Sequence, residues 1–161
     1  MIITADLTNL SNGVIIANGA KFPVSCNVRT LKNGTRGRAV KEVRYCIPDG
    51  LPYDPLPFPK GIWNITGVEW IKDYFFDYWE YGSVRIRTDA FQMVNIWELD
   101  QDGNYLRPTD KWVKDFGYLI HYSESLTTLG CIRGSTDMKM ITLGKFVQEQ
   151  LKKEKMQIEV I

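Results

Sequence analysis

The residues of this chain best suited to covalent chemistry are a cysteine and a histidine that precedes it by ten positions. His121 is the single histidine in the sequence, and Cys131 lies between Gly130 and Ile132. A cysteine acts as a nucleophile when a base or positive charge favours its thiolate, and His121 is the only imidazole that could serve. A strand, a turn and a second short segment could bring the two side chains together. The alternative is that Cys131 is a small buried apolar residue and His121 a packed or exposed one.

The residues beside Cys131 could complete such a site. Gly130 permits a strained backbone turn and leaves room for a substrate carbonyl to approach. Backbone N–H groups near Cys131 could then stabilise an oxyanion. Arg133 could bind a substrate carboxylate through its planar guanidinium, or could instead form a surface salt bridge.

Metal chemistry is disfavoured by the spacing of the available ligands. The three cysteines, Cys26, Cys46 and Cys131, could in number form a zinc site with His121. However, the sequence contains no Cys-x-x-Cys or His-x-x-x-His spacing. An odd number of cysteines also cannot all pair within the chain. We therefore expect no metal site and no cofactor.

The pattern of turns and apolar residues predicts a mainly β, α+β chain. With 161 residues, the length suits a single domain over 1–161. Tight-turn dipeptides such as Asn18-Gly19 and Asp102-Gly103 separate short β-branched and aromatic runs. The expected strands cover 14–17, 22–28, 40–47, 61–67, 83–87, 91–99 and 117–121. Apolar residues at 3.6-residue spacing predict one helix over 137–153, and alternation predicts a closing strand over 156–161.

Two further segments allow more than one interpretation. Residues 48–59 contain five prolines and predict an extended loop, either a rigid connector or a flap beside a binding groove. Residues 71–81 are dense in aromatics and predict a helix. Its aromatic face suits core packing, a substrate groove or a sugar-stacking wall.

The overall charge and hydropathy exclude some classes of partner. The sequence has 20 Lys and Arg against 19 Asp and Glu, a net charge of +1, which disfavours an electrostatic role with nucleic acid. No apolar run is long enough to span a bilayer. The first residues also lack a basic start and a long apolar stretch, so we expect no signal peptide.

The histidine, the polar loop and the Thr128-Leu129-Gly130-Cys131-Ile132-Arg133 segment together resemble the L,D-transpeptidase catalytic-domain signature. That signature has a histidine at a strand end, then Ser/Thr-x-Gly-Cys followed closely by Arg or Asn. Residues 57–65 are similar to the family's Thr-Pro-x-Gly-x-Tyr-x-Ile stretch. The resemblance covers about residues 20 to 137 and is firm over 117–137. It implies an L,D-transpeptidase-like antiparallel β-sandwich.

The resemblance also implies an activity. It implies acyl transfer on peptidoglycan stem peptides without a metal, with Cys131 as nucleophile, His121 as base and N–H groups near Gly130 as the oxyanion hole. Thr128 or a backbone carbonyl would orient the imidazole, and Arg133 would hold a substrate carboxylate. Thr128 and Tyr122 are also expected to line the substrate site.

This chain departs from the family pattern at particular positions. Tyr122 stands where the family usually has glycine, and Leu129 where a polar residue is common. The His-to-Cys interval is shorter than in most cross-linking members and closer to compact relatives often encoded by bacteriophages. A shortened loop could accept water instead of an amine, so a transferase and a hydrolase both remain open.

The expected location follows from this resemblance. The protein would be made in the cytoplasm and act on the cell wall after release or as a virion component. The rival hypothesis is a non-catalytic virion-associated or cell-wall-binding module that keeps the fold, with Cys131 merely buried.

Overall fold

The computed structural model describes residues 1–28, 53, 55–72, 77–102 and 105–161. Within these ranges the chain is mainly β, as the sequence predicted. The strands are β1 (Ile2–Asp6), β2 (Gly13–Ala17), β3 (Ala20–Ser25), β4 (Gly61–Trp70), β5 (Val84–Thr88), β6 (Phe91–Leu99), β7 (Tyr105–Phe116), β8 (Leu119–Tyr122), β9 (Ile132–Gly134) and β10 (Met156–Val160). The helices are α1 (Asp77–Tyr81) and α2 (Asp137–Leu151).

The expectation of a β-sandwich is wrong, because eight strands close into a barrel. Their order is β1-β10-β4-β5-β8-β9-β3-β2, with β2 paired to β1. Two parallel pairings make closure possible: β1 with β10, where Ile2 faces Gln157, and β8 with β9, where Ile120 faces Ile132. Hairpin signals specify only antiparallel neighbours along the chain. They therefore could not indicate that the first and last strands join.

The hairpin between β2 and β3 follows from its turn residues. Asn18 and Gly19 both have positive φ, at 49° and 79°. Two successive positive φ values are what a two-residue type I′ turn requires, and Asn-Gly is the sequence best able to adopt them. Ala17 and Ala20 face each other across this turn. The predicted hairpin is thus confirmed.

Helix α2 packs on the core of the barrel. The Thr136 hydroxyl caps its start by accepting the Lys139 N–H at 3.2 Å. Met140, Leu143 and Val147 are fully buried and belong to the same apolar cluster as the barrel interior. The helix and the closing strand β10 were both predicted, although α2 ends at Leu151 rather than at 153.

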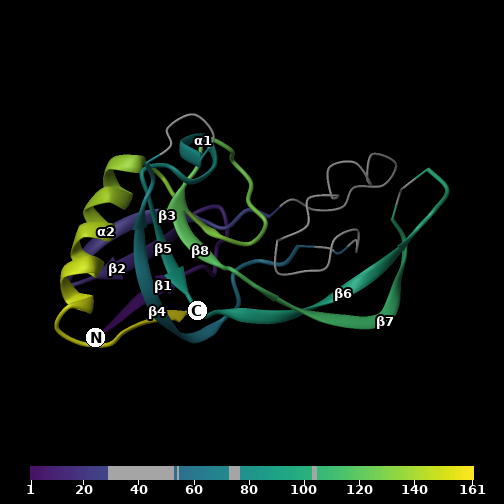
Figure 1. Cartoon of the computed structure of the whole chain (residues 1–161), viewed down its shortest axis with the longest axis horizontal. Coiled ribbons are helices and arrows are strands. Elements are labelled where there is room, and N and C mark those ends of the chain that lie inside the picture. The colour runs from purple at the N-terminus through teal and green to yellow at the C-terminus, as the bar shows by residue number, and fades with distance from the viewer. Residues whose placement is uncertain (29–52, 54, 73–76, 103–104) are drawn as a thin grey trace.

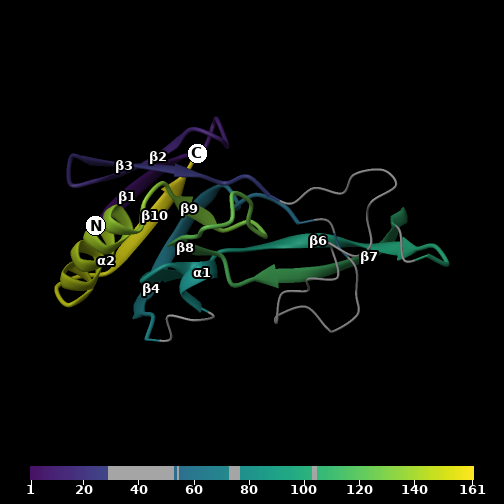
Figure 2. The ribbon, with the colours of Figure 1, turned by 90° about the horizontal axis from the view of Figure 1, so that it is seen from above.

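A long two-stranded ribbon, β6 with β7, projects from the barrel (Figures 1 and 2). On one face Val94 and Ile96 pack with Tyr53 in a second, smaller apolar cluster. Strand β6 has the predicted bounds, whereas β7 was not predicted. The β7 sequence carries a proline and several charged residues that interrupt a simple alternation, because much of this strand is exposed.

Several predictions fall partly or wholly outside the described residues. Residues 29–52, 54, 73–76 and 103–104 lie outside the described ranges. The expected strand 40–47, with Cys46, is among them. The predicted helix over 71–81 is described only as the short α1. The described part of the proline-rich segment, residues 53 and 55–59, contains no strand or helix, in agreement with the predicted loop, and Tyr53 forms an isolated β-bridge with Ile96.

Candidate functional site

The register between β8 and β9 sets His121 opposite Arg133, two residues after Cys131. Ile120 faces Ile132, and His121 faces Arg133. Ile120 and Ile132 are fully buried in the core. Because side chains alternate along a strand, His121 and Arg133 lie on the opposite, outer face. Cys131 directly precedes β9, and its sulfur contacts the backbone of Gly117 and Leu119, which come shortly before His121 in the chain.

Cys131 lies directly before β9, against the backbone at the start of β8. The Leu119 N–H donates to its sulfur at 3.4 Å, and the sulfur lies 4.0 Å from the Gly117 carbonyl oxygen. A backbone N–H directed at sulfur stabilises a thiolate more than a thiol, because the anion is the better acceptor. The side chain is 6% exposed, so the site as described is closed around the sulfur.

His121 is held by a backbone carbonyl. Its Nδ1 lies 2.7 Å from the Tyr122 carbonyl oxygen, and the residue is 3% exposed. A carbonyl only accepts hydrogen bonds, so Nδ1 carries the proton and Nε2 is the basic nitrogen of the neutral ring. The Tyr81 ring meets the imidazole edge to face, with ring centroids 5.2 Å apart. Of the two expected ways of orienting the imidazole, Thr128 or a backbone carbonyl, the structure contains the carbonyl.

Thr128 instead organises the loop that carries Cys131. Its hydroxyl donates to the Cys131 carbonyl at 2.9 Å and accepts the Gly130 N–H at 3.2 Å. Gly130 has a φ of 114°, a conformation that other residues rarely adopt. This positive φ agrees with the expectation that position 130 requires glycine. The Gly130 N–H is engaged by Thr128, so it does not act as an oxyanion donor in this arrangement.

Arg133 and Tyr122 form the other side of the site. The Arg133 Nε donates to the Ser123 carbonyl at 2.7 Å, and the guanidinium lies 5.2 Å from the centre of the Tyr122 ring. None of the acids in the described ranges forms an ion pair with Arg133, so the surface salt bridge is not seen there. The guanidinium is thus oriented by a carbonyl and an aromatic face, as a carboxylate-binding group would be.

The sequence interpretation missed two residues that continue from His121 across the neighbouring strands. Arg85 on β5 faces His121 across the strand pair, and Glu69 on β4 faces Arg85. The Arg85 guanidinium hydrogen-bonds to Glu69 and lies 4.6 Å from the centre of the Tyr81 ring. Glu69, Arg85, His121 and Arg133 therefore form a row across four adjacent strands. The only sequence signal for this row of charged side chains was the alternation of Arg85 and Arg87 in the predicted strand 83–87.

Glu69 is electrostatically coupled to this row. The hydrogen bond from Arg85 holds the pKa of the Glu69 carboxyl below its usual value, with a further hydrogen bond from Arg87, against the opposing effect of partial burial. An ionised Glu69 keeps Arg85 in place over Tyr81, and Tyr81 in turn packs on the imidazole.

The cysteines of the described ranges have separate environments. Cys26 is fully buried in the barrel core, where its Sγ donates to the Gly130 carbonyl at 3.4 Å and accepts the Phe58 N–H at 3.3 Å. In the part of the chain that the structure describes, no three His, Cys, Asp or Glu side chains group as metal ligands. Cys26 thus supports the Cys131 loop from inside rather than sharing a metal with it.

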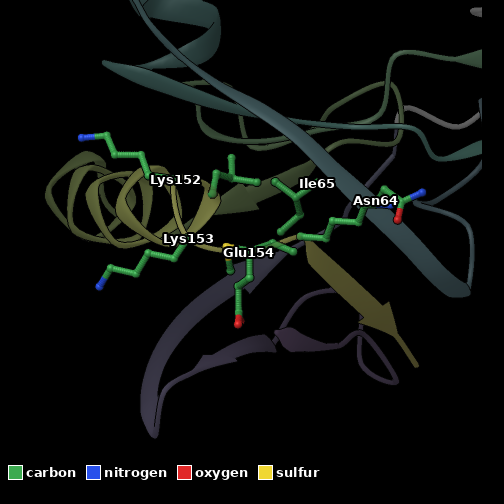
Figure 3. Close-up of a pocket in the computed structure, with 8 residues that line it drawn as sticks. Asn64, Ile65, Lys152, Lys153 and Glu154 are labelled. Carbon is green, nitrogen blue, oxygen red and sulfur yellow. The ribbon is translucent and has the colours of Figure 1, made fainter.

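A hollow of about 530 Å³ lies away from these residues, between the end of α2, the start of β10, and β4 (Figure 3). Lys152 and Lys153 are part of its rim, but Figure 3 shows both side chains extending outward. Lys152 pairs with Glu149 on the same helix, at 2.8 Å. None of the predicted site residues lines this hollow, so we assign it no role in the chemistry.

No protein-family model matches this chain, and no curated protein or solved structure matches it either. None of the helices in the described ranges is both long and apolar enough to cross a lipid bilayer.

Proposed function

We propose that this protein catalyses cysteine-dependent acyl transfer or hydrolysis, with Cys131 as nucleophile and His121 as base. The observation that carries the proposal is the pairing of β8 with β9, which brings Cys131, the residue just before β9, against Leu119, two residues before His121. The Tyr122 carbonyl supports it by leaving Nε2 as the basic nitrogen. The Leu119 N–H supports it by offering a hydrogen bond to the sulfur.

The reaction divides into two steps. His121 Nε2 takes the thiol proton, and the Cys131 sulfur attacks a substrate carbonyl to form a tetrahedral oxyanion. The oxyanion collapses, the C–N bond breaks, and the imidazolium returns its proton to the leaving amine, which leaves a thioester. A second amine then displaces the sulfur, as in a transpeptidase, or water does, as in a carboxypeptidase. Either nucleophile restores the thiol.

The proposed substrate is a peptidoglycan stem peptide. Support comes from the resemblance of the His121-to-Arg133 segment to L,D-transpeptidases and from an arginine suited to a substrate carboxylate. On this proposal the third stem residue is the acyl donor and the terminal D-residue leaves. The protein would be made in the cytoplasm and reach the wall after release or as part of a virion.

The test is turnover of purified muropeptides, read by mass spectrometry. Cys131→Ala is expected to abolish turnover, because it removes the sulfur that forms the proposed acyl intermediate. Cys26→Ala and Cys46→Ala are the matched controls and should retain it. Wild-type turnover by the Cys131→Ala variant would show that the nucleophile is assigned wrongly.

A non-catalytic cell-wall-binding or virion module is the second candidate. One observation favours it: Cys131 and His121 are 6% and 3% exposed, less than a substrate needs. Reaction with iodoacetamide separates the two candidates. A nucleophilic Cys131 should be alkylated below pH 7 and faster than either other cysteine, whereas a merely buried one should react only on unfolding.

A further inference from the structure

A second hollow, of about 250 Å³, has two residues in its wall that contact the sulfur of Cys131. Two of the residues that line it touch this sulfur: Leu119 through its N–H at 3.4 Å, and Gly117 through its carbonyl oxygen at 4.0 Å. The remaining wall comes from β4, β5, the turn after β5 and the end of β7. The hollow and the sulfur of Cys131 thus have Gly117 and Leu119 as shared neighbours.

The hollow contains a cation that no described acid neutralises. Lys114 lines it, and its Nζ lies 4.3 Å from the centre of the Phe91 ring, a cation–π contact. None of the acids in the described ranges forms an ion pair with Lys114. Arg87 also lines the hollow, but its guanidinium is bound to Glu69. Of the two cations that line the hollow, Lys114 is therefore the one that can pair with a bound anion.

The same hollow contains a fixed carboxylate. Asp89 accepts hydrogen bonds from the Asn64 backbone N–H at 2.7 Å and from the Asn64 Nδ2 at 2.6 Å. Both donors are neutral, and no cation of the described ranges forms an ion pair with Asp89. Each carboxylate oxygen keeps a second lone pair for a ligand. The wall thus carries one positive and one negative group, each without a counter-ion in the described part of the chain.

We propose that this hollow binds the zwitterionic head group of an amino acid, with its ammonium on Asp89 and its carboxylate on Lys114. A ligand with both charges pairs with both wall groups. A simple anion or amine pairs with one of them and is repelled by the other, or leaves it without a partner. The volume suits one amino-acid residue. That this head group belongs to the acyl donor or acceptor rests on the proposed function, whereas binding itself does not.

Three probes of matched chain length test the recognition: norleucine, hexanoate and pentylamine. Norleucine carries both charges, hexanoate lacks the ammonium and pentylamine lacks the carboxylate. Binding is followed by NMR through the amide signals of Gly117 and Leu119 as each probe is added. Norleucine is expected to bind about tenfold or more tightly than the other two, since each charged hydrogen bond contributes at least that factor. Hexanoate or pentylamine binding as tightly as norleucine would overturn the proposal.

Two variants assign the charges. In Lys114→Gln, norleucine should bind no more tightly than pentylamine, because the carboxylate has lost its partner. In Asp89→Asn, norleucine should bind no more tightly than hexanoate. Lys111→Gln and Asp110→Asn are the matched controls, since both residues lie exposed on β7 outside the hollow, and neither should change the order of the probes. If norleucine still bound more tightly than both single-charge probes in both variants, the assignment of Lys114 and Asp89 as its partners would be refuted. If Asp89→Asn failed to fold, Lys114→Gln alone would still test the carboxylate partner.

Failure here is distinguishable from failure of the proposed function. Cys131→Ala removes the nucleophile and should bind norleucine as the wild type does. Norleucine should also slow the alkylation of Cys131 in the wild type, because it occupies space next to the sulfur. If norleucine bound selectively but did not slow the alkylation of Cys131, the ligand would lie away from the sulfur. That result would overturn the link between the hollow and the acyl site, but not the binding of an amino acid.

Discussion

Replacing Thr128 with valine isolates the contribution of one hydroxyl to the loop that carries Cys131. The hydroxyl accepts the Gly130 N–H at 3.2 Å and donates to the Cys131 carbonyl at 2.9 Å. Thr128 is 8% exposed and both partners are buried, so water does not readily replace it. Thr128→Val keeps the shape of the side chain and leaves a donor and an acceptor unsatisfied.

The expected loss can be worked from these two bonds. Each unsatisfied buried group costs about 1–3 kcal/mol, and the added methyl recovers less than about 1 kcal/mol. The free energy of unfolding should therefore fall by about 1–5 kcal/mol. For a chain of this length each kcal/mol lowers Tm by about 2–4 °C, so a central value of about 3 kcal/mol predicts a decrease of about 6–12 °C.

Urea denaturation followed by circular dichroism measures the change. The midpoint should fall while the slope m stays constant, because the surface exposed on unfolding is the same. Thr128→Ser keeps the hydroxyl and should cost no more than about 1 kcal/mol. Thr142→Val removes an exposed hydroxyl that bonds to the Met138 carbonyl within α2, and should change stability by no more than about 0.5 kcal/mol. Equal stability of Thr128→Val and Thr128→Ser would refute the reasoning.

Three further predictions concern the site and its surroundings. His121→Ala should move the pH at which Cys131 becomes reactive toward iodoacetamide upward, toward about 8.5, the value of a free thiol; an unmoved profile would end the claim that the two residues act together. Because the hydrogen bond from Arg85 lowers the pKa of Glu69 in the folded state, Glu69 stabilises the fold above the ordinary carboxyl pKa, and this contribution is lost as pH falls through the lowered folded value. The free energy of unfolding of the wild type should thus be larger than that of Glu69→Gln at pH 7 and equal to it in strong acid. A difference between the two proteins that persists in strong acid would contradict this reasoning. Turnover of muropeptides should survive excess EDTA, whereas loss with recovery on adding zinc would replace the cysteine mechanism by a metal-dependent one.

Local structure could be predicted wherever neighbouring residues decide it. The Asn18-Gly19 turn requires two positive φ values and formed the predicted hairpin. Strand β6, helix α2 and the closing strand β10 also lie where alternation and 3.6-residue spacing placed them. These signals come from single residues and their close neighbours, so they need no knowledge of the rest of the chain.

The candidate site was predicted in part for the same reason. Cys131, His121 and Arg133 could be singled out by residue type and spacing, and Gly130 by the conformational freedom that its positive φ now requires. Thr128 was singled out as well, but its partners in the Cys131 loop became clear only from the hydrogen bonds. A hydroxyl can bond to any nearby group, and spacing alone does not choose among them.

Closure of the barrel and the surroundings of His121 were decided only by tertiary structure. The parallel pairing of β1 with β10 joins the two ends of the chain, and no turn between them signals it. Arg85 faces His121, and Glu69 faces Arg85, because β4, β5 and β8 follow one another in the sheet, although these residues are far apart in sequence. Periodicity specifies which face of a strand is buried, whereas the neighbour of that strand depends on which arrangement of all the strands buries the most apolar surface while pairing the backbone.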